Sequence, residues 1–170
     1  MNYSEISIQA NILLKKYGLY KIPINIEALA KKLTIKIFVD FLPDDISGIL
    51  DFRNEPAIIL INSTHGLNRR RFSLAHEIGH FYLHKPSGIH VDKQTFFRNI
   101  KSQKGLDEIE IEANRFAAEL LMPADLLTNE LEQFFDPIDS DEDVISELSK
   151  KFEVSTTAMS FRLQNLRYHF

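Results

Sequence analysis

Two histidines stand four residues apart, and a glutamate directly follows the first, in the stretch RRRFSLAHEIGHFYLH at residues 69–84. On an α-helix, residues four apart lie on one face with Cβ atoms about 5–6 Å from each other. His76 and His80 can therefore bind one small cation through their imidazole nitrogens. Glu77 lies about 60° around the helix from His80 at ~100° per residue, so it can take a proton from water beside the cation without being a ligand. The pattern predicts a metal-dependent hydrolase centre.

The alternative is an ordinary amphipathic helix in which these three residues occur together by chance. A third residue able to bind the metal would favour the metal centre over this chance match. Leu83 and Pro86 exclude the longer pattern HExxHxxGxxH, which would supply a third histidine. A later stretch, DEIEIEANRFAAELLMP, predicts a helix over about residues 108–122 that carries several carboxylates. The third ligand is therefore sought on that second helix.

Only one carboxylate of the second helix faces the core when ~100° separates successive residues. Glu110 shares its side with the small or apolar residues Ala113, Ala117 and Leu121. The opposite side predicts a solvated face on which carboxylates pair with Arg115: Glu108, Glu112 and Glu119. Because a buried carboxylate is costly unless it is paired or binds a metal, Glu110 is predicted as the third ligand, and the metal centre is favoured over the chance match.

Two neutral imidazoles and one carboxylate leave one tetrahedral position vacant, which is typical of catalytic rather than structural zinc. The predicted cofactor is therefore Zn²⁺, with Glu77 as the general base that later delivers a proton to the leaving amine. Asn114, one turn beyond Glu110, either donates or accepts a hydrogen bond at a ligand histidine or caps a neighbouring backbone group.

The residue that would stabilise an oxyanion is left open by the sequence. The candidates are His65, Tyr82, His84 and His90. His84 continues the spacing of His76 and His80, but at a helix end a histidine commonly caps carbonyl groups.

The remaining pattern predicts an α+β fold with a small sheet. Helices are expected over residues 4–17, 25–32, 68–84, 108–122 and 123–135, and strands over 34–41, 47–52 and 56–62. A long loop over 85–107 is expected to hold a strand at 90–92 or 96–98. Phe96, Phe97 and Arg98 in that loop either join the core or lie along an extended peptide at a sheet edge. Gly79, inside a helix, predicts close approach of another backbone.

Composition limits the class of protein. A chain of 170 residues with 44% hydrophobic and 26% charged residues suits one globular domain, and without cysteine any metal must be held by His, Asp or Glu. The sequence has neither a membrane-spanning run nor a signal-peptide layout, which suits the cytoplasm. Residues 62–104 carry eight Lys/Arg against two Asp/Glu, and residues 105–153 carry three against fifteen. This asymmetry indicates two oppositely charged solvated faces or, alternatively, a basic rim including Arg69–Arg71 that steers an acidic partner.

The C-terminal stretch ELSKKFEVSTTAMSFRLQNL has the pattern of a helix-turn-helix, with a helix to about Lys151 and a second helix capped by Ser155. Its second helix offers only Arg162, Gln164 and Arg167 as ready donors to DNA, and no basic stripe is present. Packing residues are expected at Met159, Phe161, Leu163 and Leu166. We therefore expect a structural or substrate-docking role for this tail rather than duplex binding.

Three separate blocks, RFSLAHEIGHFYLH, GIHVDKQTFFR and EIEANRFAAELLMP, together resemble the ImmA/IrrE family of metallo-endopeptidases. The resemblance covers most of residues 20–125. It implies a zincin-like catalytic domain over residues 1–135, followed at 136–170 by an acidic linker and a helix-turn-helix-like tail packed on the same domain. It also implies Zn²⁺ bound by His76, His80 and Glu110, with Glu77 as the catalytic glutamate.

Members of this family often act as anti-repressors of phages and mobile elements by cleaving a helix-turn-helix repressor. The resemblance thus implies a zinc endopeptidase with a narrow protein substrate, a transcriptional repressor. The alternative is a non-proteolytic regulator that binds DNA or a repressor and has a structural or vestigial metal site. The oligomeric state, the substrate's identity and the scissile bond are not predicted.

Overall fold

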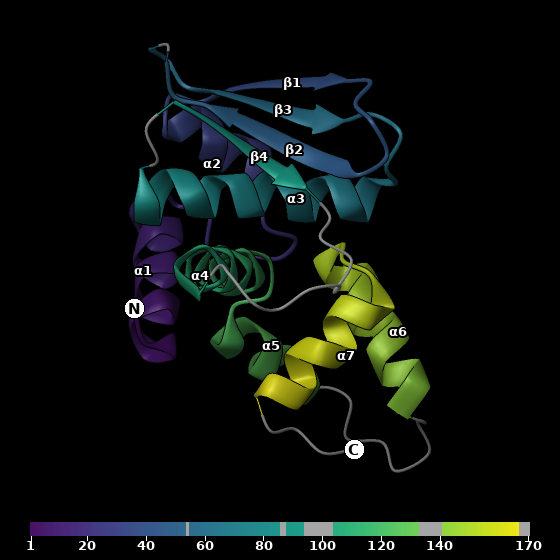
Figure 1. The fold of residues 1–170 in the computed structure, drawn as a ribbon. Helices are drawn as coiled ribbons and strands as arrows, with labels where there is room; N and C mark the ends of the chain where they lie inside the picture. Colours follow the sequence, from purple (N-terminus) through teal and green to yellow (C-terminus); the bar gives the residue numbers. More distant parts are fainter. Residues whose placement is uncertain (54, 86–87, 94–103, 133–140, 167–170) are drawn as a thin grey trace.

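A four-stranded sheet lies on one side of a long helix, α3, in the computed structural model, which describes residues 1–53, 55–85, 88–93, 104–132 and 141–166 (Figure 1). The strands are β1 (Lys36–Asp40), β2 (Ile46–Asp51), β3 (Ile58–Asn62) and β4 (Ile89–Lys93). Their order is β1-β3-β2-β4, with β1 parallel to β3 and the other two pairs antiparallel. β1 and β4 are therefore the two edges of the sheet.

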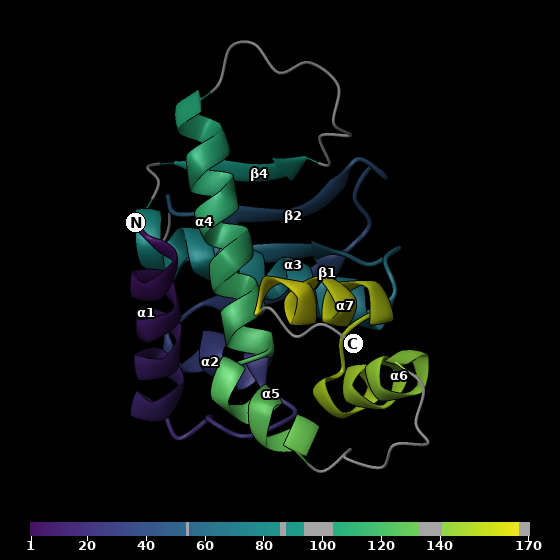
Figure 2. The same ribbon diagram turned by 90° about the horizontal axis from the view of Figure 1, so that it is seen from below.

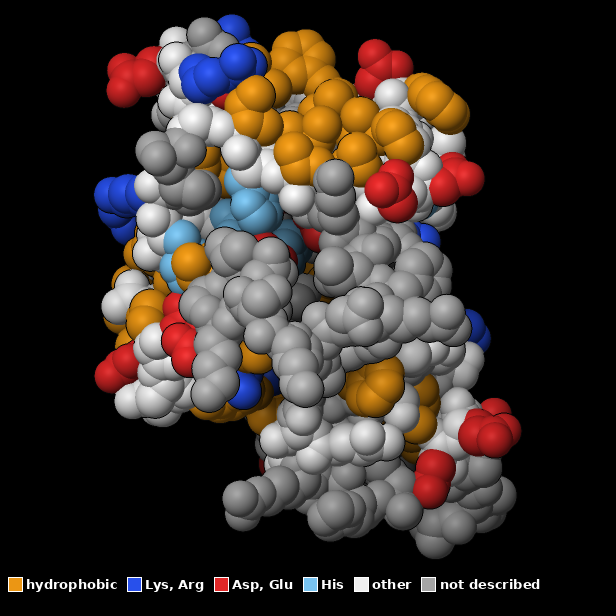
Figure 3. Space-filling model, viewed as in Figure 1, with side chains coloured by type: hydrophobic (Ala, Val, Ile, Leu, Met, Phe, Trp, Pro, Cys, Tyr) orange, Lys and Arg blue, Asp and Glu red, His pale blue; other side chains and the backbone are white. Residues whose placement is uncertain are grey.

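The pairing register separates a core face from an outer face, because side chains alternate along a strand. Leu50, Ile59 and Ile61 are buried against the helices. On the outer face, one row crosses all four strands and is entirely apolar: Phe38, Leu60, Ile49 and Val91. Figure 3 shows this hydrophobic patch over the sheet, with histidine side chains reaching the surface below it.

The helices form a second layer beneath the sheet. They are α1 (Tyr3–Lys16), α2 (Ile26–Lys32), α3 (Leu67–Gly79), α4 (Lys104–Leu121), α5 (Ala124–Leu131), α6 (Asp141–Phe152) and α7 (Thr156–Asn165). α4 packs across α3, and α1 lies along α4 (Figures 1 and 2). This confirms the α+β class and the four predicted strand regions, including 90–92 for the last strand.

The contact between α3 and α4 depends on Gly79, as the sequence predicts. A Cβ atom on Gly79 would lie 3.1 Å from the backbone oxygen of Ala113 and 3.2 Å from its Cα atom. The small residues Ala113 and Ala117 on α4 are fully buried at this contact. The two helix backbones therefore approach closely at the point where both predicted ligand-bearing segments meet.

The predicted helix over 68–84 changes form at its end. The α-helix stops at Gly79, and His80–His84 continue as a single π-helical turn that ends at Lys85, whose φ of 43° is left-handed. His84 ends this turn. Its ring centroid lies 5.8 Å from that of His80, so it stays next to the second histidine of the motif, as its spacing in the sequence implies.

The prediction of a solvated face with carboxylate–Arg115 pairs on α4 is wrong for two of its carboxylates. Glu119 is only 1% exposed and forms an ion pair with Arg162 of α7, with 2.7 Å between Oε2 and Nη2. Glu112 faces His84 at 3.6 Å and the amino group of Met1. The physical reason is that α4 is covered on a second side. The prediction assumed that only the side bearing Glu110 is buried, whereas α1 and α7 pack against the side that bears Glu112 and Glu119.

The tail has the predicted helix–turn–helix shape, and Ser155 caps α7 by accepting a hydrogen bond from the amide of Ala158. Met159 and Leu163 join the core as expected, whereas Phe161 is 62% exposed. Arg162 is buried, and its Nε donates to the carbonyl oxygen of Met122. It is thus not a free donor to DNA.

Several further predictions concern residues that the structure does not describe or test. Phe96, Phe97, Arg98 and Arg167 lie outside the described residues, as do the end of the helix expected to reach 135 and most of the acidic linker. The domain division at residue 135 stays a prediction. No helix among the described residues is long and apolar enough to cross a membrane.

Candidate metal centre

His76 and His80 project from the buried side of α3 and the start of the π-helical turn. They are 3% and 1% exposed, and their Nε2 atoms are 2.9 Å apart. This is the one-face arrangement that the four-residue spacing predicts. Two ring nitrogens so close together must share a proton or a cation, because two lone pairs at this distance repel each other.

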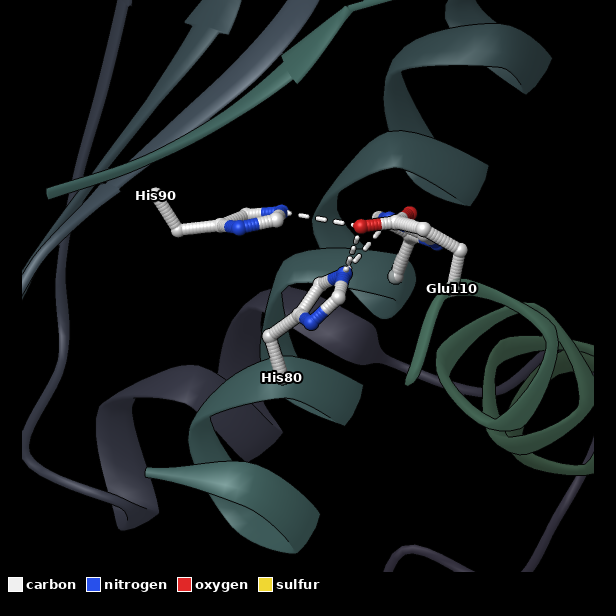
Figure 4. Close-up of side chains that lie close together, drawn as sticks. His80, His90 and Glu110 are labelled. Carbon is white, nitrogen blue, oxygen red and sulfur yellow. Dashed lines mark hydrogen bonds and ion pairs between the residues drawn. The ribbon is translucent and has the colours of Figure 1, made fainter. Parts of the chain in front are cut away.

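Glu110 reaches the same point from α4. Its carboxylate oxygens lie 3.2 Å from His76 Nε2 and 3.4 Å from His80 Nε2 (Figure 4). Burial acts to raise the pKa of Glu110, but the neighbouring imidazoles of His76 and His80 prevail and hold that pKa well below its usual range. Glu110 is therefore ionised and adds a negative charge to the cluster, as expected of the third ligand.

Asn114 orients the first histidine. Its Oδ1 lies 3.0 Å from His76 Nδ1, so the Nδ1–H group donates to the amide oxygen and leaves Nε2 unprotonated towards Glu110 and His80. This contact favours the histidine-orienting interpretation of Asn114 over a backbone cap. Such a partner fixes the tautomer that a metal ligand needs.

His90 of β4 is brought to the cluster, although the sequence offered it only as one of four oxyanion candidates. Its Nε2 lies 3.5 Å from Glu110 Oε1, and its ring centroid lies 3.9 Å from that of His80 (Figure 4). One ligand atom from each of His76, His80, His90 and Glu110 lies within 4.8 Å of the others. Burial, together with the neighbouring His80, lowers the pKa of His90 to about 4, so its imidazole is neutral at pH 7.

Glu77 lies behind the cluster against β2. It is fully buried, and neither carboxylate oxygen has a hydrogen-bond partner among the described residues. A Cβ atom on Gly48 would lie 2.8 Å from Glu77 Oε1, so any other residue there would force the Glu77 side chain to shift. Burial and the nearby carboxylates of Asp92 and Glu110 raise the pKa of Glu77 well above its usual range.

The other three oxyanion candidates contribute no atom to the four-residue cluster. The Tyr82 hydroxyl donates to Gln9 Oε1 on α1, and its ring stacks on Phe116. His84 faces Glu112. His65 has a buried Nδ1 atom with no hydrogen-bond partner among the described residues, and burial together with Arg69 lowers its pKa.

The donor set fits a metal ion. Three imidazole nitrogens and one carboxylate are the nitrogen and oxygen ligands that divalent transition metals take in proteins without cysteine. Three ring nitrogens and one carboxylate oxygen converge here, and the cluster holds only one negative charge. A cation at the shared point would pair with Glu110 and accept the Nε2 lone pairs of His76 and His80. His90 Nε2, which has no hydrogen-bond partner among the described residues, lies close enough to be a fourth ligand or to donate to a group bound at the cation.

Comparison with known proteins agrees with this geometry. The family model described as the IrrE N-terminal-like domain matches residues 30–164. That range contains every residue of the cluster, all of α6, and α7 up to Gln164.

Three relatives are similar to parts of the chain. The uncharacterized immunity region protein 2 of Bacillus phage phi105 is 31% identical over 121 residues, which is 71% of this chain and 70% of the relative. The radiation response metalloprotease IrrE of Deinococcus radiodurans is 33% identical over 112 residues, or 66% of this chain and 32% of the relative. The metallopeptidase ImmA of Bacillus subtilis is 30% identical over 86 residues, or 50% of this chain and 47% of the relative.

The chain thus spans less than half of each of the two relatives named as metalloprotease or metallopeptidase. The match to the family model, however, extends over most of its length and includes the histidine- and glutamate-bearing helices that form the cluster. This chain belongs to the ImmA/IrrE family of metallopeptidases.

Proposed function

We propose that the chain is a zinc-dependent endopeptidase that cleaves a specific protein, a helix-turn-helix transcriptional repressor. His76, His80 and Glu110 bind the metal, Glu77 is the general base, and Asn114 orients His76. The domain that carries this chemistry is zincin-like. A repressor substrate also implies a cytoplasmic site of action.

The observation that carries the proposal is the state of Glu77. A carboxylate buried with both oxygens unpartnered among the described residues costs several kcal/mol unless it takes up a proton or faces a cation. In a structural metal site, a buried carboxylate that does not bind the metal would add this cost without serving a function. A hydrolytic site needs such a group, because it must exchange protons with water and with the leaving amine.

A bound zinc ion would supply Lewis-acid polarisation of the scissile carbonyl and of the attacking water. Glu77 takes the proton of that water, and its raised pKa brings its basicity closer to neutral pH, where such transfer is efficient. The same carboxyl then gives the proton to the amine nitrogen as the peptide bond breaks. Gly48 keeps the β2 backbone clear of the glutamate, so its carboxylate has room at the site.

His90 is assigned to the oxyanion within this proposal. It is neutral at pH 7 and comes from an edge strand, whereas the three ligands come from two helices packed on each other. Its N–H group can donate to an oxygen that gains negative charge beside the cluster. β4 has no second strand partner among the described residues, so an extended peptide can pair with its free edge.

One observation favours the second candidate function, a non-proteolytic regulator. If His90 were a permanent fourth ligand, it would close the tetrahedral site, and the metal would be structural. Metal titration separates the two: His90→Ala keeps zinc affinity within about threefold if His90 is not a ligand, whereas His80→Ala lowers it by 100-fold or more. Equal losses in both variants would favour the regulator.

The repressor is proposed as substrate from the family and from the names of the relatives. One relative is an immunity region protein of a phage, and another is a radiation response metalloprotease. Direct binding to duplex DNA loses support because Arg162 is buried in an ion pair.

The test is incubation of the zinc-loaded chain with the repressor encoded beside its gene, followed by mass mapping of fragments. We expect one or a few cuts by the wild type and none by Glu77→Gln, which keeps zinc and repressor binding. Glu108→Gln, an exposed change of the same chemistry, is the control and should cut normally. A Glu77→Gln variant that still cleaves would refute the role given to this residue.

A further inference from the structure

A groove of about 640 Å³ lies between α3, α4 and α7, beside the metal centre. Its apolar walls come from all three elements and from the turn before α7: Phe72, Ala118, Met122, Val154, Ala158 and Phe161. Phe161, which the sequence predicts as packing surface of the tail, lines the groove and is 62% exposed. An exposed phenylalanine beside a hollow of this size fits a surface that receives another apolar group.

The groove is continuous with the metal centre through one residue. Asn114 lines the groove, and its Oδ1 atom is the partner of His76 Nδ1 at 3.0 Å. Asn114 therefore stands between the groove and the Nδ1 side of His76, while the Nε2 side of the same ring faces Glu110. The groove and the cluster thus lie on the two sides of one histidine ring, a separation that a large substrate side chain next to the scissile bond can span.

The charged residues that line the groove are all basic. Its lining contains three arginines and no acidic residue. Arg162 is neutralised by Glu119 inside the fold, which leaves Arg69 and Arg115. Both are exposed, and neither forms an ion pair within the part of the chain that the structure describes. An occupant with an apolar side chain and a nearby carboxylate would satisfy both the walls and the rim.

We infer that this groove is the substrate subsite for a large apolar side chain next to the scissile bond, with Asp or Glu within about three residues of it. The inference rests on the proposed endopeptidase function and specifies its substrate class. It also gives the helix-turn-helix-like tail a part in the enzyme, because α7 supplies one wall. Arg69, from the basic run before the histidines, becomes part of the rim that selects an acidic segment.

The subsite is tested by cleavage profiling on a peptide library prepared from a bacterial proteome, with the repressor added, and cut positions read by mass spectrometry. The zinc-loaded wild type should favour Leu, Ile, Met or Phe at one position beside the cut and Asp or Glu nearby. Ala158→Trp, which fills the groove, should lower kcat/KM for such peptides about tenfold or more, since it excludes the side chain that would be buried.

Charge reversal gives a matched pair of variants on one helix. Arg69→Glu should lower cleavage of acidic peptides about three- to tenfold and raise that of basic peptides. Arg70→Glu makes the same change one residue on, but Arg70 lines a different hollow on the far side of α3, so the preference should not change. Zinc content measured on every variant shows that the metal centre remains intact.

The outcomes separate this inference from the function on which it rests. If the wild type cuts neither the library nor the repressor, the endopeptidase function is refuted and the subsite with it. If it cuts without apolar or acidic preference, or if Ala158→Trp and Arg69→Glu leave the profile of the wild type unchanged, the subsite is wrong and the enzyme stands. If only the repressor is cut, the same comparison uses repressor variants with Ser in place of the apolar residues beside the cut.

Discussion

Replacing Glu77 by glutamine should stabilise the metal-free protein while it abolishes cleavage. Glu77 is fully buried, and burial is the main cause that raises its pKa well above the ordinary 4.5. In the metal-free fold the carboxyl must therefore hold a proton that the unfolded chain releases. Glutamine is neutral in both states and avoids this cost.

The magnitude follows from proton linkage. Between the ordinary pKa of 4.5 and the raised folded-state pKa, each pH unit costs the wild type about 1.4 kcal/mol of folding free energy. Because the folded-state pKa is raised, the wild type loses stability as pH rises above 4.5. The advantage of Glu77→Gln therefore grows from near zero by about 1.4 kcal/mol per pH unit until the carboxyl ionises in the fold.

Urea denaturation of both metal-free proteins at about pH 5, 6 and 7 measures the difference, with equal slopes required for comparison. Glu108→Gln, at an exposed position, should show no pH-dependent gain. A gain for Glu77→Gln that is the same at all three pH values would refute the reasoning, because it would show that the carboxyl does not carry an extra proton in the fold.

Two further predictions concern the packing that holds the site. Gly79→Val should lower stability by about 1–3 kcal/mol and weaken zinc binding at least tenfold in a chelator competition, because the added atoms push α4 and Glu110 away at Ala113. Unchanged affinity would contradict this. Arg162→Met should lower the free energy of unfolding by about 3–5 kcal/mol, because it leaves Glu119 charged and buried, and Glu119→Leu in the same chain should recover most of the loss. Additive losses in the double variant would show that the pair is not coupled.

The part of the site carried by helices could be predicted from sequence, because helical spacing fixes which side chains share a face. His76, His80 and Glu110 lie together as this geometry implies. Gly79 likewise marks the close helix contact. These inferences need only the helical periodicity of each segment and the assumption that the apolar faces of the two helices pack against each other.

The parts that could not be predicted depend on contacts distant in sequence. His90 reaches the cluster through the pairing of β4 with β2, and nothing local fixes that register. Gly48 has no sequence signal that connects it with Glu77. The environment of Glu119 was predicted wrongly because the helical wheel assumed one buried side, whereas α1 and α7 cover a second.

The ion pair between α4 and α7 also constrains how this protein can evolve. A recombination event that replaced α6 and α7 would bring in a different helix pair. The incoming helices would have to carry a guanidinium at the position of Arg162, because otherwise the buried carboxylate of Glu119 on α4 would lose its ion-pair partner. The two halves are therefore expected to be inherited together, so that change in the last helix is paired with change in the helix that bears Glu110.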